Sequence, residues 1–216
     1  IAYALLLGGE TFHGLSKINF TLSAQTLQDM EKNNHKDIVF VDYRGEKVFS
    51  LVVNGTTVTQ EEGKPSPFRD HRIYFDMKYL VPGENSATIR YESKYCRDCE
   101  GVQYFKDKDD DEEYIYSNHE PASAHKGFPC FDQPDLKATY TFLAVAPRDW
   151  TVVANAPQVG SKSYQGAHAF KAKLKSFGVD EAEFLSHFKG EQTCCFVFAE
   201  SPRISTYLYC FIAGPY

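Results

Sequence analysis

The sequence lacks several features that would assign it to a common class of protein. Its 216 residues include no apolar run long enough to cross a membrane. No basic stripe with interleaved aromatic residues accompanies the net charge of -6, which argues against a nucleic-acid binder. Residues 2–7 are too short for a signal peptide, lack a basic flank and alternate like a strand. We therefore expect a cytoplasmic protein that contacts neither nucleic acid nor a membrane.

The amino-acid composition of the chain is typical of one folded β domain. Hydrophobic residues make up 43% and aromatic residues 15% of the chain, and the aromatics are mostly Tyr and Phe, which suit strands. Apolar side chains alternate at Ile18, Phe20 and Leu22, as in a strand with one solvated face. These patterns predict a single all-β domain over residues 1–216, mainly antiparallel and arranged as a saddle-shaped sandwich. The expected strands cover residues 3–7, 15–23, 38–43, 47–53, 71–75, 87–95, 138–146, 150–154, 195–198 and 206–212.

The six cysteines allow two interpretations. Cys96-x-x-Cys99 is half of a zinc knuckle, but no second pair of ligands follows at a usable spacing. Adjacent Cys194 and Cys195 would point to opposite faces of a strand and could not easily complete one metal site. The spacing therefore favours free thiols in a reducing compartment over a metal site.

Residues 114–141 carry the densest set of signals in the chain. Glu120 precedes Pro121, which predicts an extended Glu120 followed by a helix with Pro121 at its first position. Residues 122–126 would form one or two helical turns, and Gly127 would end them in the left-handed conformation. The Glu120 carboxylate would then either cap this helix or face a cleft.

Two further patterns belong to the same stretch. His119-Glu120 followed by His125 imitates a zinc-binding helix, but the gap is longer than in H-E-x-x-H and contains a proline, so we reject a zinc site here. Residues 128–131 are too apolar for an exposed loop and are expected in the core. Residues 133–135 are expected to turn the chain into the next strand.

Taken together, the stretch from Glu120 to Ala138 closely resembles the signature of the aminopeptidase N family of zinc metallopeptidases. The resemblance continues, in the expected order, at residues 37–48, 53–55, 81–85 and 205–216. In that family these segments belong to the N-terminal β-domain, and the catalytic domain is a separate unit. The resemblance implies that Glu120 grips the free α-amine of a peptide substrate and that Asn118 matches a position where the family often has Gln. Lys126 stands where many relatives have Arg.

The family's catalytic motifs, H-E-x-x-H and G-A-M-E-N, are absent from this chain. The chain alone is therefore expected to be inactive, with no catalytic residue, metal ligand or cofactor of its own, and zinc is expected in a catalytic domain absent from this chain. Two interpretations follow. The chain is the N-terminal, non-catalytic domain of a zinc aminopeptidase, lining the substrate pocket and holding the peptide N-terminus through Glu120 and Asn118. Alternatively, it is a stand-alone truncated domain that acts as a structural or interaction subunit of a larger assembly.

Two segments stand apart from the β pattern. Apolar residues at helical spacing over 179–189 predict a helix inserted relative to the family, which would pack in the core or dock a protein partner. The acidic run 106–113 lacks the central Gly of a calcium loop, which favours a solvated connection beside the substrate cleft.

Overall fold

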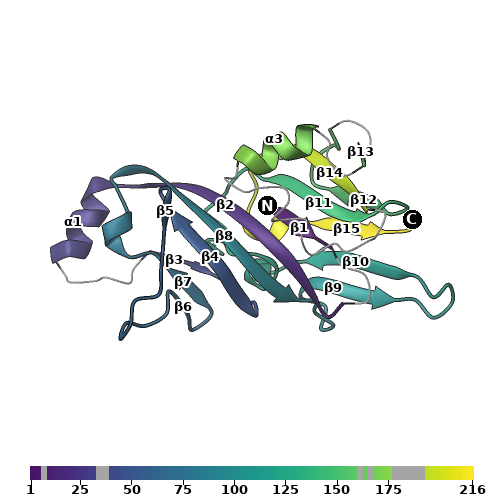
Figure 1. Ribbon diagram of the computed structural model, residues 1–216, viewed down its shortest axis with the longest axis horizontal. Helices are drawn as coiled ribbons and strands as arrows, with labels where there is room; N and C mark the ends of the chain where they lie inside the picture. The colour runs from purple at the N-terminus through teal and green to yellow at the C-terminus, as the bar shows by residue number, and fades with distance from the viewer. Residues whose placement is uncertain (6–8, 33–38, 160–162, 165–167, 177–192) are drawn as a thin grey trace.

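The computed structural model describes residues 1–5, 9–32, 39–159, 163–164, 168–176 and 193–216. Within these residues the strands form three sheets, and every neighbouring pair except β1 and β11 is antiparallel. The prediction of a mainly antiparallel all-β sandwich is therefore confirmed (Figure 1). In the same residues, no helix is long and apolar enough to cross a bilayer.

The large sheet has the strand order β13-β14-β11-β1-β2-β8-β4-β5. Its strands are β1 (Ala2–Ala4), β2 (Thr11–Leu22), β4 (Lys47–Val53), β5 (Thr56–Thr57), β8 (Gly83–Lys94), β11 (Thr141–Pro147), β13 (Ser163–Tyr164) and β14 (Thr193–Glu200). The second sheet has the order β12-β15-β10-β9, with β9 (Gly101–Lys106), β10 (Glu113–Asn118), β12 (Thr151–Ala154) and β15 (Phe211–Gly214). The third has the order β3-β7-β6, with β3 (Phe40–Asp42), β6 (Phe68–Arg69) and β7 (Arg72–Tyr74). The helices are α1 (Ala24–Lys32), α2 (Ala124–Gly127), α3 (His168–Ser176) and the 3₁₀ turns η1 (Met77–Tyr79) and η2 (Thr206–Leu208).

The main core lies between the large sheet and the four-stranded sheet. Tyr3 of β1 and Phe12 of β2 project from the large sheet and pack with ring centroids 5.2 Å apart. Tyr3 also meets Phe211 of β15 at 5.3 Å, which joins the two sheets. Large aromatic side chains bury much apolar area and add a modest term from edge-to-face geometry. This cluster therefore fixes how the two sheets face one another.

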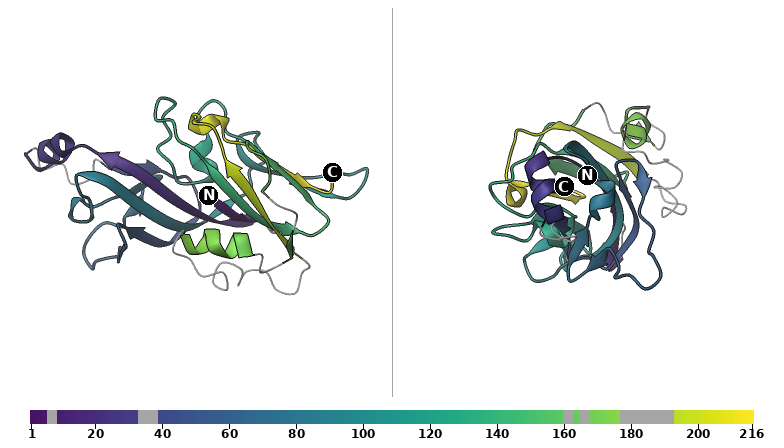
Figure 2. Two further views of the ribbon diagram at one scale, coloured as in Figure 1. Left: turned by 90° about the horizontal axis from the view of Figure 1, so that it is seen from above. Right: turned by 90° about the vertical axis from the view of Figure 1, so that its left-hand side faces the viewer.

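The opposite face of the large sheet is covered by α3 (Figures 1 and 2). Phe170 and Leu174 of α3 pack against a small cluster that includes Leu143 and Val145 of β11. Because β11 is covered on both sides, its sequence is a continuous apolar run over residues 142–146 rather than an alternating one. The helix predicted over 179–189 lies outside the described residues, whereas α3 just before it was not predicted.

Several boundaries differ from the sequence-based expectation. The expected strand 206–212 is divided into the η2 turn and β15, because a 3₁₀ turn closed by the Tyr209 N–H to Thr206 O hydrogen bond interrupts it. Strand β8 begins at Gly83 rather than near residue 87 and pairs with β2 over all twelve residues. Strands β9 and β10, the hairpin that carries the acidic connection, were not predicted, because polar residues at their ends hide the alternation.

Candidate functional site

The two predicted site residues lie at one end of β10. Asn118 is the last residue of this strand and pairs with Gly101 of β9, and Glu120 follows two residues later. Both side chains are exposed. The acidic connection between β9 and β10 lies at the opposite end of the same hairpin, beyond the Lys106–Glu113 pair. The acidic run is therefore a hairpin loop distant along the strands from Asn118.

Asn118 stands on the outer face of the four-stranded sheet, in line with a row of exposed apolar side chains. Tyr116, Ile212 and Val153 are direct partners across β10, β15 and β12, with exposures of 37%, 39% and 49%. Residues directly opposite one another share a face, and Asn118 is two positions beyond Tyr116, so it points to the same side. The alternate residues, such as Ile115, are buried against the core. The outer face thus presents apolar surface that ends at Asn118, two residues before Glu120.

The amide of Asn118 links two backbone segments. Its Nδ2 donates to the carbonyl oxygen of Cys99 at 2.7 Å, and its Oδ1 accepts from the Glu120 backbone N–H at 3.4 Å. The Glu120 carboxylate makes no hydrogen bond or ion pair with the described residues. An exposed carboxylate on a backbone that is itself held in place is available for a cationic ligand.

The turn after Glu120 differs from the predicted helix. Residues 120–123 form a single turn closed by the Ser123 N–H, which donates to the carbonyl oxygen of His119 at 2.8 Å, and α2 begins only at Ala124. The Glu120–Pro121 peptide bond is cis. Because α2 begins at Ala124 and Ser123 is its N-cap residue, Pro121 is not the first helical residue and Glu120 does not cap the helix.

Gly127 is also required for a different reason from the predicted one. It is the last residue of α2 and does not have a positive φ. A Cβ at Gly127 would lie 2.8 Å from Nε2 of His119 and 3.2 Å from Cγ2 of Val102. Gly127 therefore serves the close approach of α2 to β9 and to His119, not a left-handed helix end.

A cluster of charged groups joins the α2 turn to the connection between β8 and β9. The Lys126 ammonium contacts Oε2 of Glu100 at 2.6 Å and Oδ2 of Asp98 at 3.2 Å. The hydroxyl of Ser123 donates to the same Glu100 oxygen at 3.0 Å. Hydrogen bonding from Lys126 and Ser123 lowers the pKa of Glu100, and hydrogen bonding to Glu100 raises the pKa of Lys126. The sequence identified Lys126 but not its partners, because the partners lie more than twenty residues away.

His119 and Asp132 anchor the turn through hydrogen bonds to neighbouring segments. The His119 Nδ1 lies 2.7 Å from the carbonyl oxygen of Tyr209; since a carbonyl only accepts, Nδ1 carries the proton. Burial lowers the pKa of His119 to about 4. Asp132 accepts from the backbone N–H and Nδ1 of His125 and from the hydroxyl of Thr206. Burial by itself raises the pKa of Asp132, but these hydrogen bonds lower it, and the net result is a pKa below the usual value. The prediction that residues 128–131 enter the core is confirmed at Phe128 and Cys130, which are 1% and 5% exposed.

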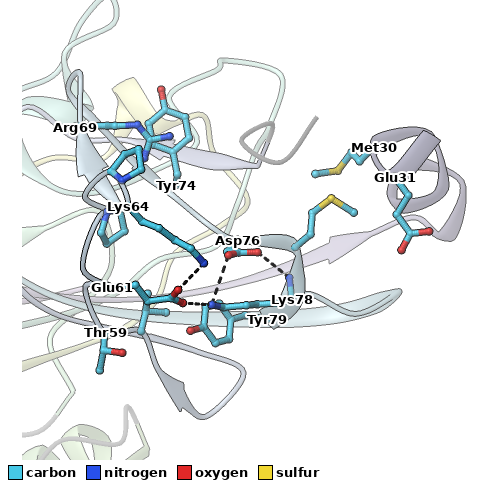
Figure 3. A pocket seen from close by; sticks show the side chains of 14 residues that line it. Met30, Glu31, Thr59, Glu61, Lys64, Arg69, Tyr74, Asp76, Lys78 and Tyr79 are labelled. Carbon is cyan, nitrogen blue, oxygen red and sulfur yellow. Dashed lines mark hydrogen bonds and ion pairs between the residues drawn. The ribbon is translucent and has the colours of Figure 1, made fainter. Parts of the chain in front are cut away.

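The two described cavities lie away from Glu120 and Asn118. One, of about 540 Å³, is bounded by α1, η1 and the connection after β5, and in it Glu61 pairs with Lys64 and Lys78 (Figure 3). The three acidic and three basic side chains around it balance, so the cavity favours neither sign of ligand charge. The other, of about 550 Å³, lies between Ile1, β2 and the start of β11.

The residues that the structure describes contain no cluster of three or more His, Cys, Asp or Glu side chains suited to a metal ion. These residues therefore offer no ligand set for a zinc ion, and the family resemblance assigns the zinc to the separate catalytic domain. All six cysteines are free thiols. Cys194 and Cys195 belong to the cores on opposite faces of the large sheet, as expected from their adjacent positions on a strand.

Comparison with known proteins identifies the family. The family model for the peptidase M1 N-terminal domain matches residues 5–176, and the chain belongs to this family. The chain is similar to aminopeptidase N of Streptomyces lividans, with 30% identity over 177 residues, which are 82% of this chain and 16% of that protein. It is also similar to a probable M1 family aminopeptidase of Encephalitozoon cuniculi, with 34% identity over 46% of this chain and 9% of that protein. The glutamyl aminopeptidase of Sus scrofa is 32% identical over 44% of this chain and 7% of that protein. The chain thus spans less than a fifth of the length of these relatives.

Proposed function

We propose that this chain is the N-terminal, non-catalytic domain of a zinc aminopeptidase that removes N-terminal residues from peptides. In this role the chain lines one side of the substrate pocket, and Glu120 binds the free α-amine of the peptide. The zinc ion would supply the hydrolytic chemistry from a catalytic domain outside these 216 residues. Family membership and the similarity to aminopeptidases support the proposal.

The observation that carries the proposal is the unpaired carboxylate of Glu120. It is exposed and has no partner among the described residues, while the backbone on either side of it is hydrogen-bonded. An α-ammonium group offers three donors, and a fixed carboxylate can accept one or two of them in charge-assisted hydrogen bonds. The Oδ1 of Asn118 makes only a 3.4 Å bond to the Glu120 N–H. It keeps a free lone pair that can accept from the third donor of the ammonium group. A carboxylate and an amide oxygen two residues apart offer an ammonium ligand two kinds of acceptor.

The exposed row of Tyr116, Ile212 and Val153 supports the same proposal. Apolar side chains aligned on one face of a sheet are typical of a surface that another protein unit covers. A catalytic domain packed on this face would end next to Asn118 and Glu120, which closes a pocket around the peptide N-terminus. Free thiols at all six cysteines are in keeping with a cytoplasmic location.

The test uses the full-length product of the gene that encodes this chain. Glu120→Gln removes the charge while keeping the shape, and we expect KM for a peptide amide with a free α-amine to rise by about 10- to 100-fold, the range for hydrogen bonds to charged groups. The kcat should change much less, because the amine contact is made in both ground and transition states. Glu62→Gln, at an exposed carboxylate on the distant 61–67 loop, is the matched control. An unchanged KM for Glu120→Gln would remove the proposed role.

The exposed row on the four-stranded sheet also fits the alternative, a stand-alone structural or interaction subunit. The intact mass of the native gene product separates the two functions. A mass several times the 24.5 kDa of this chain supports the peptidase domain, and a mass near 24.5 kDa supports the subunit.

A further inference from the structure

We propose that the loop of residues 96–100, together with Lys126, fixes the position of the Glu120 turn, and that Lys126, Glu100 and Gln103 are positioning residues for amine binding. The inference deepens the proposed function and rests on it. It concerns residues that do not touch the substrate. They would act through Glu120, whose carboxylate has no partner of its own among the described residues.

The 96–100 loop holds the turn on its downstream side through Glu100. One oxygen of Glu100 accepts both from the Ser123 hydroxyl at 3.0 Å and from the Lys126 ammonium at 2.6 Å. Ser123 is 4% exposed and the Lys126 side chain 13%, whereas the side chains of Glu100 and Asp98 are 47% and 61% exposed, so the donors are covered and the carboxylates face solvent. A single exposed ion pair contributes little, whereas several charged and polar contacts in one network hold a segment more firmly. The turn and the loop are therefore joined by three contacts, from Ser123 and Lys126 to Glu100 and from Lys126 to Asp98.

The same loop holds the turn on its upstream side through Asn118. The carbonyl oxygen of Cys99 accepts from Asn118 Nδ2 at 2.7 Å, and Asn118 Oδ1 in turn accepts from the Glu120 N–H. Glu120 thus lies between two contacts to one loop, at Asn118 before it and at Ser123 and Lys126 after it. The position of its backbone depends on the loop at both ends.

Gln103 fixes the loop itself. Its side chain is 2% exposed, its Oε1 accepts from the Cys99 N–H at 3.1 Å, and its Nε2 donates to the Glu100 carbonyl oxygen at 2.7 Å. One buried amide therefore orients the two residues that contact the Glu120 turn. Asp98 adds a further bond to the loop, since its Oδ1 accepts from the Glu100 N–H at 3.2 Å.

Two glycines allow this close packing of α2 on β9. Gly101, with φ of 85°, follows the loop, and a Cβ there would lie 2.9 Å from Cβ of Lys126. A Cβ on Gly127 would lie 3.2 Å from Val102 Cγ2. Because neither glycine carries a side chain, the Lys126 stem lies directly against the loop and its ammonium reaches both carboxylates.

A carboxylate that binds a cation gains affinity when its position is set before the ligand arrives, because less conformational entropy is lost on binding. Releasing the loop should therefore weaken amine binding without removing the carboxylate. The effect should appear in KM rather than in kcat, since the loop does not contact the reacting bond.

The experiment compares variants of the full-length gene product. Lys126→Met keeps the aliphatic stem but removes the charge, Lys126→Arg keeps a charge that can reach both carboxylates, and Lys106→Met is the matched control. Lys106 pairs with Asp111 at 3.0 Å at the other end of the same hairpin. We expect Lys126→Met to raise KM for a free-amine peptide about 5- to 10-fold with kcat within about two-fold. Lys126→Arg and Lys106→Met should leave KM within about two-fold of the parent protein.

A double variant separates positioning from general destabilisation. If Lys126 acts through Glu120, Lys126→Met should have no further effect on KM in a Glu120→Gln background, because coupled residues are not additive. Hydrogen exchange of residues 119–127 should be faster in Lys126→Met than in Lys106→Met, since the Ser123 and Lys126 amides bond within the turn. Glu100→Gln should show the same absence of a further KM effect and the same faster hydrogen exchange. It replaces Lys126→Met in both tests if Lys126→Met does not fold.

The outcomes distinguish this inference from the proposed function. If Glu120→Gln raises KM but Lys126→Met and Glu100→Gln do not, the positioning inference is overturned and the proposed function stands. Fully additive effects of Lys126→Met and Glu120→Gln would also overturn it. If Glu120→Gln leaves KM unchanged, the proposed function is wrong and the positioning role falls with it.

Discussion

His119 Nδ1 donates to the carbonyl oxygen of Tyr209 at 2.7 Å, and the two rings are stacked with centroids 6.0 Å apart. His119 thus connects the end of β10, where Asn118 lies, to the segment between η2 and β15. Its other nitrogen, Nε2, is buried without a hydrogen-bond partner and faces Gly127. The folded state therefore favours the neutral form of His119 and disfavours its protonation.

The free energy of unfolding should fall as pH falls through the range in which His119 resists protonation. Its pKa of about 4 in the folded chain lies below the value of about 6.5 in the unfolded chain, so the unfolded state binds more protons between these values. The loss should begin near pH 6.5 and reach about 3 kcal/mol below pH 4. Urea unfolding at several pH values gives the free energy of unfolding of the parent and of His119→Phe. Because both proteins contain Asp132, the difference between them removes the stability that Asp132 loses in acid.

His119→Phe should be less stable than the parent protein at pH 7, by about 1 kcal/mol, because the Tyr209 carbonyl loses its partner, but its stability should vary less with pH. His71→Asn is the control, since His71 is exposed with φ of 58°, a conformation that Asn tolerates. Equal pH slopes in the parent and in His119→Phe would contradict the assignment to His119.

Gly127→Ala should destabilise the chain by about 1–3 kcal/mol, the cost of adding a methyl group to a packed site. The new Cβ would meet His119 Nε2 at 2.8 Å and Val102 at 3.2 Å, and both neighbours are buried. Gly63→Asn is the comparison, because Gly63 has φ of 77° and open space around it. Thermal unfolding should show a lower Tm for Gly127→Ala only. An unchanged Tm would mean that α2 can move away from β9.

Asp132→Asn should destabilise the chain by about 2 kcal/mol, because Asp132 is a shielded acceptor for three donors. The carboxylate accepts from the His125 N–H at 3.1 Å, from His125 Nδ1 at 2.7 Å and from Thr206 at 2.8 Å. An amide nitrogen would face at least one of these donors. Urea unfolding of Asp132→Asn against Asp135→Asn, at an exposed neighbour, measures the cost. Equal stabilities would show that an amide replaces the carboxylate without loss.

Cysteine reactivity should follow burial. Cys99 and Cys210 are exposed, whereas Cys130, Cys194 and Cys195 are buried. Burial also raises the pKa of the Cys130 thiol, which reduces the reactive thiolate. Brief treatment of the folded protein with iodoacetamide should therefore label Cys99 and Cys210 well before those three. Mass spectrometry of the digested protein gives the order, and denatured protein, in which all six should react, is the control. Rapid labelling of Cys130 in the folded protein would contradict the packing described for residues 128–131.

Some of the fold could be read from residue order because neighbouring side chains decide it. The alternation around Ile18 and Phe20 predicted a strand, and the apolar run at Phe128 predicted a core segment; both are confirmed. The prediction of a helix beginning at Pro121 was wrong, because residues 120–123 form a single turn and the helix begins at Ala124. Local preference favoured a helix start at Pro121, whereas the contacts of the turn place it three residues later.

The sequence by itself determined the class of fold, the family resemblance and the candidate carboxylate, since each depends on residue types at short spacing. Only the tertiary structure decided how Glu120 is held. Glu100 and Lys126 are 26 residues apart, and Asn118 and Cys99 are 19 apart, yet each pair is in hydrogen-bond contact. No local pattern specifies these contacts, because they form only when β9 pairs with β10 and α2 packs against β9. The exposed, unpaired state of the Glu120 carboxylate is likewise a property of the folded surface.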